Sequence, residues 1–135
     1  MKNKISIILL VLTSLVLSAC AFYIDEDSYS MAAQGQYTLT YSFAGANKDA
    51  LQKATVMALQ DRGWIVESDA NPVKAKLDRG RHNAVASFTI SDNSISVDTK
   101  GSMVDGNKPY VPKRYVDFVM KSVRSIVTPK VQITL

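Results

Sequence analysis

The chain has 135 residues, of which 47% are apolar and 21% are charged, and its formal net charge is +4. This length fits one domain with its own core, and the apolar content with only 6 Gly and 4 Pro excludes disordered and fibrous chains. One His and one Cys are too few for an ordinary zinc site, and a single Cys cannot form an internal disulfide. We therefore expect no metal and no cofactor.

Residues 1–19 have the layout of a secretory signal peptide. Lys2 and Lys4 form a charged start, and the mostly apolar stretch 5–17 is short for a mature membrane span. The letters LSAC that follow, ending at Cys20, resemble the lipobox of bacterial lipoproteins. The resemblance implies that the Cys20 thiol is diacylglycerated, that cleavage occurs before it, and that the new amine is acylated. The alternative is an ordinary signal peptide or membrane anchor that happens to contain a cysteine.

A lipidated Cys20 changes both the location and the charge of the protein. Each buried methylene contributes about 0.8 kcal/mol, so two or more acyl chains hold a protein firmly at a membrane. Ala21 stands where lipoproteins retained at the inner membrane tend to have Asp, so the same resemblance favours the outer membrane, with the domain facing the periplasm. Loss of Lys2 and Lys4 lowers the formal charge from +4 to +2, which weakens the argument for a polyanion partner.

The mature chain divides into a tether over 20–35, which shows no clean hydrophobic period, and a domain over 36–135. Residues 37–43 alternate strictly between bulky apolar and hydroxyl side chains, which predicts a half-buried strand. Asn47 is predicted to cap a helix that ends at about Arg62, before Gly63. Its buried stripe is predicted to be Leu51, Ala54, Ala58 and Leu59.

Short alternating stretches at 64–67, 73–78, 84–91 and 94–98 predict a meander of antiparallel strands. Two-residue loops at 80–81 and 92–93 fix the register. They place these apolar residues opposite each other: Leu77 and Ala84, Ala75 and Ala86, Phe88 and Val97, Ile90 and Ile95. Trp64 is predicted to be buried in the core.

Residues 100–110 are predicted to be a polar loop, and Pro112 is predicted to open a second helix that ends before Pro129. In this helix Asp117 is spaced to pair with Arg114 or Lys121. Its core-facing stripe is predicted to be Val116, Val119, Met120, Val123, Ile126 and Val127. Residues 131–135 alternate again and are a candidate last strand. The order of elements predicts an α+β two-layer sandwich with a mostly antiparallel sheet and both helices on one face.

The chain contains four short motifs in this order: RGW at 62–64, AxLxRxxHxA at 75–84, SISV at 94–97 and YxxFV at 115–119. Over about residues 50–127 this pattern resembles a group of small, mostly uncharacterised bacterial lipoproteins. The chain departs from the group in three ways: Phe118 replaces the usual Trp, Asn93 stands where an aromatic is common, and the spacing from Pro112 to Tyr115 is one residue longer. The resemblance implies no activity.

Arg79 and His82 are the first candidate site. The predicted turn sets them opposite each other at the rim of the helix-covered face, where the guanidinium disfavours a charged imidazole and leaves His82 neutral at pH 7. Such a pair suits an anionic ligand, but we favour a pair that caps the sheet end and contacts a carboxylate or a helix terminus. Ser87 and Asp78 alternate onto the other face, so His82 lacks a nucleophile and an orienting acid. We therefore expect no enzyme activity.

The basic side chains of the second helix are the other candidate site: Lys113, Arg114, Lys121 and Arg124. These side chains could bind lipid A phosphates or a cell-wall polyanion. They could also form a plain solvated helix face, and we favour this second interpretation. No nucleic-acid recognition motif is present, and we expect no nucleic-acid partner. The sequence thus predicts a membrane-anchored envelope lipoprotein with a non-catalytic binding or scaffolding domain. The expected partner is an envelope protein or an anionic envelope polymer. The alternative is a periplasmic ligand or polyanion sensor that uses Arg79, His82 and the basic helix.

Overall fold

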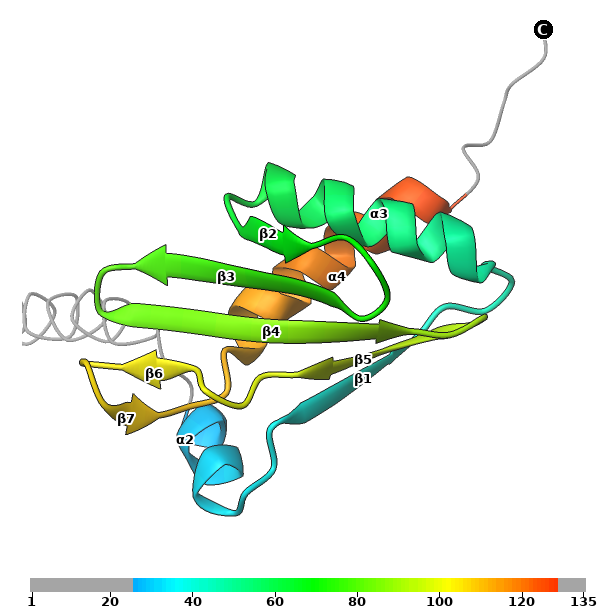
Figure 1. The fold of residues 1–135 in the computed structure, drawn as a ribbon. Helices are drawn as coiled ribbons and strands as arrows, with labels where there is room; N and C mark the ends of the chain where they lie inside the picture. Colours follow the sequence, from blue (N-terminus) through cyan, green and yellow to red (C-terminus); the bar gives the residue numbers. More distant parts are fainter. Residues whose placement is uncertain (1–25, 129–135) are drawn as a thin grey trace, which may run out of the picture.

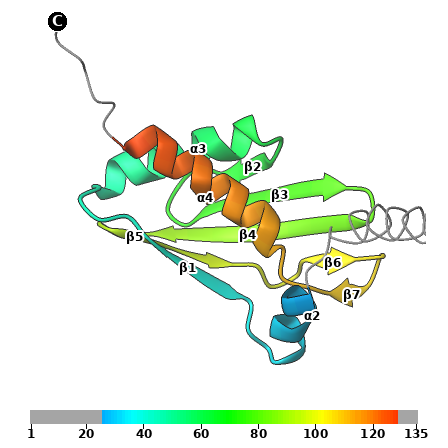
Figure 2. The same cartoon turned by 180° about the vertical axis from the view of Figure 1, so that it is seen from behind.

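The computed structural model describes residues 26–128 and shows an open antiparallel sheet with two helices against one face (Figures 1 and 2). The long strands follow the order β1-β5-β4-β3-β2, and a short hairpin, β6–β7, extends the sheet beside the start of β4. The strands are β1 (Thr38–Ser42), β2 (Ile65–Ser68), β3 (Val73–Arg79), β4 (His82–Ile90), β5 (Ser94–Asp98), β6 (Met103–Val104) and β7 (Lys108–Pro109). The predicted α+β two-layer sandwich is confirmed.

The strand register follows from the two tight loops, as predicted. The partners across β3, β4 and β5 are Leu77 and Ala84, Ala75 and Ala86, Phe88 and Val97, and Ile90 and Ile95. Because side chains alternate along a strand, this register places every one of these apolar residues on the same face of the sheet. All of them are buried, and that face is the one the helices cover.

Helix α3 (Lys48–Asp61) begins and ends at the residues that the sequence marks. The Asn47 side chain accepts a hydrogen bond from the Ala50 backbone N–H at 2.8 Å, which satisfies one of the free donors of the first turn. Gly63 ends the helix in the left-handed region (φ 83°), where glycine has no Cβ to strain the backbone. The predicted stripe is buried, together with Thr55, whose hydroxyl donates to the Leu51 carbonyl.

Helix α4 (Lys113–Val127) lies beside α3 and contributes the other half of the helical layer (Figure 2). Val116, Val119, Met120 and Val123 are buried as predicted. The prediction that Ile126 faces the core is wrong, because this residue is 41% exposed. Val127, in the same last turn, is partly buried and packs against the core.

The centre of the core is aromatic. Phe88 on β4 is fully buried, and the ring of Trp64, at the corner between α3 and β2, meets it edge to face with centroids 6.4 Å apart. The RGW motif therefore turns the chain from helix to strand and fills the core at the same time.

The structure differs from the sequence prediction at two places near the start of β4. Residues 26–33 were assigned to the tether but form helix α2 (Glu26–Ala33), where Ala32 is buried and Met31 packs against the core. The polar loop 100–110 contains β6 and β7, and Val104 of β6 is fully buried opposite His82. The candidate strand 131–135 lies outside the described residues, as does Cys20.

Candidate functional site

Arg79 and His82 are cross-strand partners at the β3–β4 turn, as the register predicts. The exposed Arg79 side chain lies at the end of α3, where Nη2 makes a long contact of 3.5 Å with the Arg62 carbonyl. A cation at a helix C-terminus satisfies carbonyls that have no partner within the helix. Arg79 therefore contacts a helix terminus, which is the plainer of the two sequence interpretations.

His82 is buried rather than exposed at a rim, with 8% of its surface accessible. Its ring lies between those of Tyr110 and Tyr115, each with its centroid 5.9 Å away. Burial lowers the pKa of His82 below its ordinary value, and the Arg81 guanidinium lowers it further. The sequence predicted a lowered His82 pKa, and the direction is the same in the structure. The causes are burial and Arg81, whereas the sequence analysis had named Arg79.

Two polar atoms in this aromatic cluster are buried without a hydrogen-bond partner within the described part of the chain: His82 Nε2 and the Tyr110 hydroxyl oxygen. Burial also raises the pKa of Tyr110 above its ordinary range, so its hydroxyl stays protonated. A neutral imidazole and a neutral phenol are the forms that an apolar environment favours. His82 and Tyr110 are therefore both uncharged at neutral pH.

The charged neighbours of His82 are Arg81 and Asp105, which form a two-point ion pair that the sequence analysis missed. Arg81 Nε and Nη2 donate to the two Asp105 carboxylate oxygens at 2.7 and 3.1 Å. Arg81 lowers the pKa of Asp105 by these hydrogen bonds. The pair joins the β3–β4 turn to the β6–β7 hairpin. The Asp105-Gly106 dipeptide could have revealed this hairpin in the sequence, because Asp-Gly is typical of tight hairpin turns. Both residues have positive φ in the structure.

The basic residues of α4 divide between two sides of the helix. Lys113 Nζ pairs with an Asp117 carboxylate oxygen at 3.1 Å, and that carboxylate also accepts the Tyr41 hydroxyl hydrogen bond from β1. Arg124 donates to the Ser42 carbonyl at 3.1 Å and lies 4.7 Å from the centre of the Phe43 ring. Arg124 and Asp117 thus fasten α4 to β1, whereas Lys113 pairs with Asp117 within the helix, where the sequence analysis offered Lys121.

The other side of α4 faces away from the sheet and carries Phe118, which is 40% exposed. The guanidinium carbons of Arg62 and Arg114 lie 5.5 and 6.0 Å from the centre of its ring. Arg62 also donates to the Ser122 hydroxyl at 3.0 Å, and Lys121 is exposed nearby on the helix. We call this surface the α4 outer face: Arg62, Arg114, Phe118, Lys121 and Ser122. Sequence reasoning missed Arg62 and Phe118 as members.

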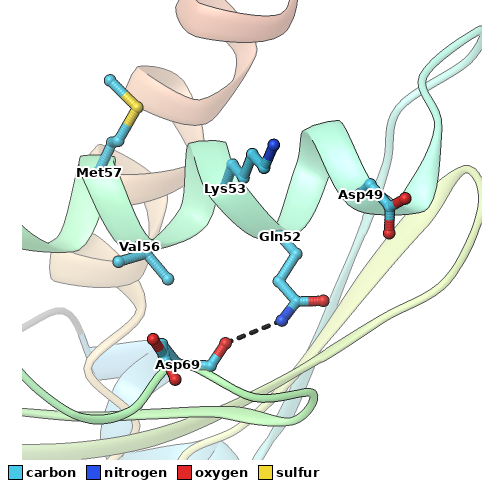
Figure 3. Close-up of a pocket in the computed structure, with 6 residues that line it drawn as sticks. All are labelled: Asp49, Gln52, Lys53, Val56, Met57 and Asp69. Atoms are coloured by element: carbon cyan, nitrogen blue, oxygen red, sulfur yellow. Dashed lines mark hydrogen bonds between the residues drawn. The ribbon is translucent and has the colours of Figure 1, made fainter.

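A groove of about 530 Å³ lies between α3 and the β2–β3 turn, away from every predicted site residue (Figure 3). Gln52 donates to the Asp69 carbonyl across it at 2.8 Å, whereas Lys53 and Met57 point away from Asp69. Ligand sites of this size usually have several polar groups converging on an apolar cavity. This groove has one internal hydrogen bond and no such convergence.

Within residues 26–128, no three His, Cys, Asp or Glu side chains are grouped to hold a metal ion. No helix of that part of the chain is long and apolar enough to cross a membrane. No family model, curated protein or solved structure matches the chain. The resemblance to small bacterial lipoproteins therefore stays a prediction.

Proposed function

We propose that the protein is a lipid-anchored lipoprotein of the bacterial cell envelope, at the outer membrane, whose α+β domain binds or scaffolds a partner without catalysis. The observation that carries the proposal is the LSAC sequence ending at Cys20, behind a charged start and a short apolar stretch. The partner would be an envelope protein or an anionic component of the envelope.

The surroundings of His82 support a role without catalysis. General base catalysis needs an imidazole that reaches both a substrate and an orienting acid. The ring neighbours of His82 are two tyrosines, and the nearby acid, Asp105, is bound to Arg81. The single histidine of the chain is thus part of the domain's interior.

With Cys20 anchored, the start of α2 limits how far the domain's first residues lie from the membrane. Helix α2 begins at Glu26 and is part of the domain, so six residue steps separate the fold from Cys20. An extended chain spans at most about 3.6 Å per residue, so the reach is at most about 22 Å. Glu26, where the described domain begins, would therefore lie within about 22 Å of the lipid anchor.

The polyanion sensor loses support from the same geometry. It requires Arg79, His82 and four basic residues of α4 to act together, but Arg79 contacts α3, His82 is buried, and Arg124 is bound to β1. We do not propose it.

The test compares the native chain with Cys20→Ser by cell fractionation and by mass spectrometry of the intact protein, with Ser18→Ala as a matched control inside the same motif. We expect the native chain and the control in the membrane fraction, beginning at Cys20 with an acylated sulfur. We expect Cys20→Ser to be released or mislocalised. An unmodified Cys20 sulfur, a native chain that still begins at Met1, or unchanged membrane retention of Cys20→Ser would contradict the proposal.

A further inference from the structure

The solvent side of the helical layer carries most of the exposed large hydrophobic side chains of the described residues. Four large hydrophobic side chains are exposed in the described chain, and three of them lie on α3 and α4: Met57, Phe118 and Ile126, at 52%, 40% and 41% exposure. The fourth, Ile65, lies on the opposite face, since it pairs with the exposed Lys76 across β2 and β3. Of these three, Phe118 is the one that lies among the basic side chains of the α4 outer face.

Phe118 points directly away from the sheet. Successive residues of an α-helix are 100° apart, so Val116 and Met120, two positions on either side of Phe118, point to the opposite side. Both are buried. Phe118 is thus held outward by the residues that fix the helix to the sheet.

Three basic side chains lie around Phe118. Arg62 and Arg114 lie over its ring, and Lys121 follows on the same side of the helix. Asp117 is turned toward β1, where Lys113 and Tyr41 bind its carboxylate. The acidic residue next to this face in sequence is Asp61, beside Arg62. Aromatic rings are favoured at the membrane–water interface, and basic side chains are attracted to anionic headgroups, so this combination suits the surface of an anionic bilayer.

The path of the chain brings this face near the proposed anchor. Helix α2 contacts β7, and three residues, 110–112, connect β7 to the start of α4 (Figures 1 and 2). Phe118 follows Lys113 by five residues, about 7.5 Å along the helix axis. The first turns of α4 are therefore at the same end of the domain as the residue from which the tether leaves.

We infer that the α4 outer face is the surface that this domain lays against an anionic phospholipid bilayer. Phe118 enters the headgroup boundary, while Arg62, Arg114 and Lys121 meet lipid phosphates. The inference rests on the proposed lipid anchor, which holds the domain at the membrane and leaves this face to set its orientation.

The test uses the full lipidated chain reconstituted into vesicles of phosphatidylcholine, with or without phosphatidylglycerol, whose acyl chains are brominated to quench tryptophan on contact. Phe118→Trp reports on the α4 outer face, and Ile65→Trp is the matched control on the opposite face. The native Trp64 is 4% exposed and gives a constant background in every variant. We expect strong quenching of the tryptophan at 118 in anionic vesicles, and none at 65.

A charge variant tests the electrostatic part. One basic residue near an anionic surface contributes about 1 kcal/mol, which is about a fivefold change in the ratio of chains bound through this face to chains that are not. We expect Lys121→Gln in the Phe118→Trp background to lower that ratio by this factor, and the matched Lys74→Gln, on the open sheet face, to leave it unchanged.

The outcomes separate the two proposals. A chain that does not float with the vesicles contradicts the lipid anchor, and the inference falls with it. A chain that floats but shows no quenching at 118, or equal quenching at 65, contradicts the inference alone and leaves this face to a protein partner. Equal quenching at 118 in vesicles without phosphatidylglycerol contradicts the requirement for anionic lipid.

Discussion

The stability of this protein should depend on the protonation of one histidine. His82 is the only histidine in the chain and is buried against two tyrosine rings, and burial lowers its pKa from the ordinary value near 6.5. In the unfolded chain the imidazole takes up a proton as the pH falls through about 6.5, whereas the folded state resists protonation. The free energy of unfolding is therefore greatest above about pH 6.5 and decreases below it, by at most about 1.4 kcal/mol per pH unit for one proton.

Urea unfolding followed by circular dichroism between about pH 7.5 and 5.5 measures this slope, because carboxylates bind few protons in that range. His82→Phe keeps an aromatic ring between Tyr110 and Tyr115 but has no proton to bind. We expect the native chain to lose stability toward the acidic end and the variant to show a flat profile. A flat native profile would refute the buried neutral imidazole, and an equal slope in both chains would assign the effect to other groups.

Two further predictions concern the core and the end of α3. Phe88→Ala should lower the free energy of unfolding by about 3–5 kcal/mol, since it removes a fully buried ring that contacts Trp64, whereas the exposed neighbour Thr89→Ala should change it by less than about 0.5 kcal/mol. A loss below about 1 kcal/mol for Phe88→Ala would mean that the strand faces are inverted. Gly63→Ala should cost about 1–2 kcal/mol in the same measurement, because alanine is strained at φ 83°; an unchanged midpoint would show that the helix ends differently.

The sheet was predictable because its register is determined locally. Two-residue loops leave one pairing for β3, β4 and β5, and that pairing had to bring Phe88 to Val97 and Leu77 to Ala84 if one face was to be apolar. Asn47 and Gly63 marked the ends of α3 for equally local reasons, a side-chain acceptor and a positive φ. These elements need no knowledge of the rest of the chain.

The elements that sequence reasoning missed depend on distant contacts. Helix α2 is short and has no strong apolar stripe of its own, and it is ordered by burial of Ala32 against the core. The β6–β7 hairpin has two-residue strands, and it is held by Val104 opposite His82 and by the ion pair of Arg81 with Asp105, 24 residues apart. Neither contact leaves a periodic pattern in the sequence.

The candidate site could be predicted only in part, because residue type alone does not say what a cation does. Arg124 and Lys121 are both basic residues of one amphipathic helix, and the sequence analysis placed them in the same candidate site. The rotation of 100° per residue turns Arg124 toward the Ser42 carbonyl and the Phe43 ring, where it fastens α4 to the sheet. The same rotation leaves Lys121 exposed beside Phe118. The helix therefore uses one set of charges to hold the domain together and exposes another on its outer face.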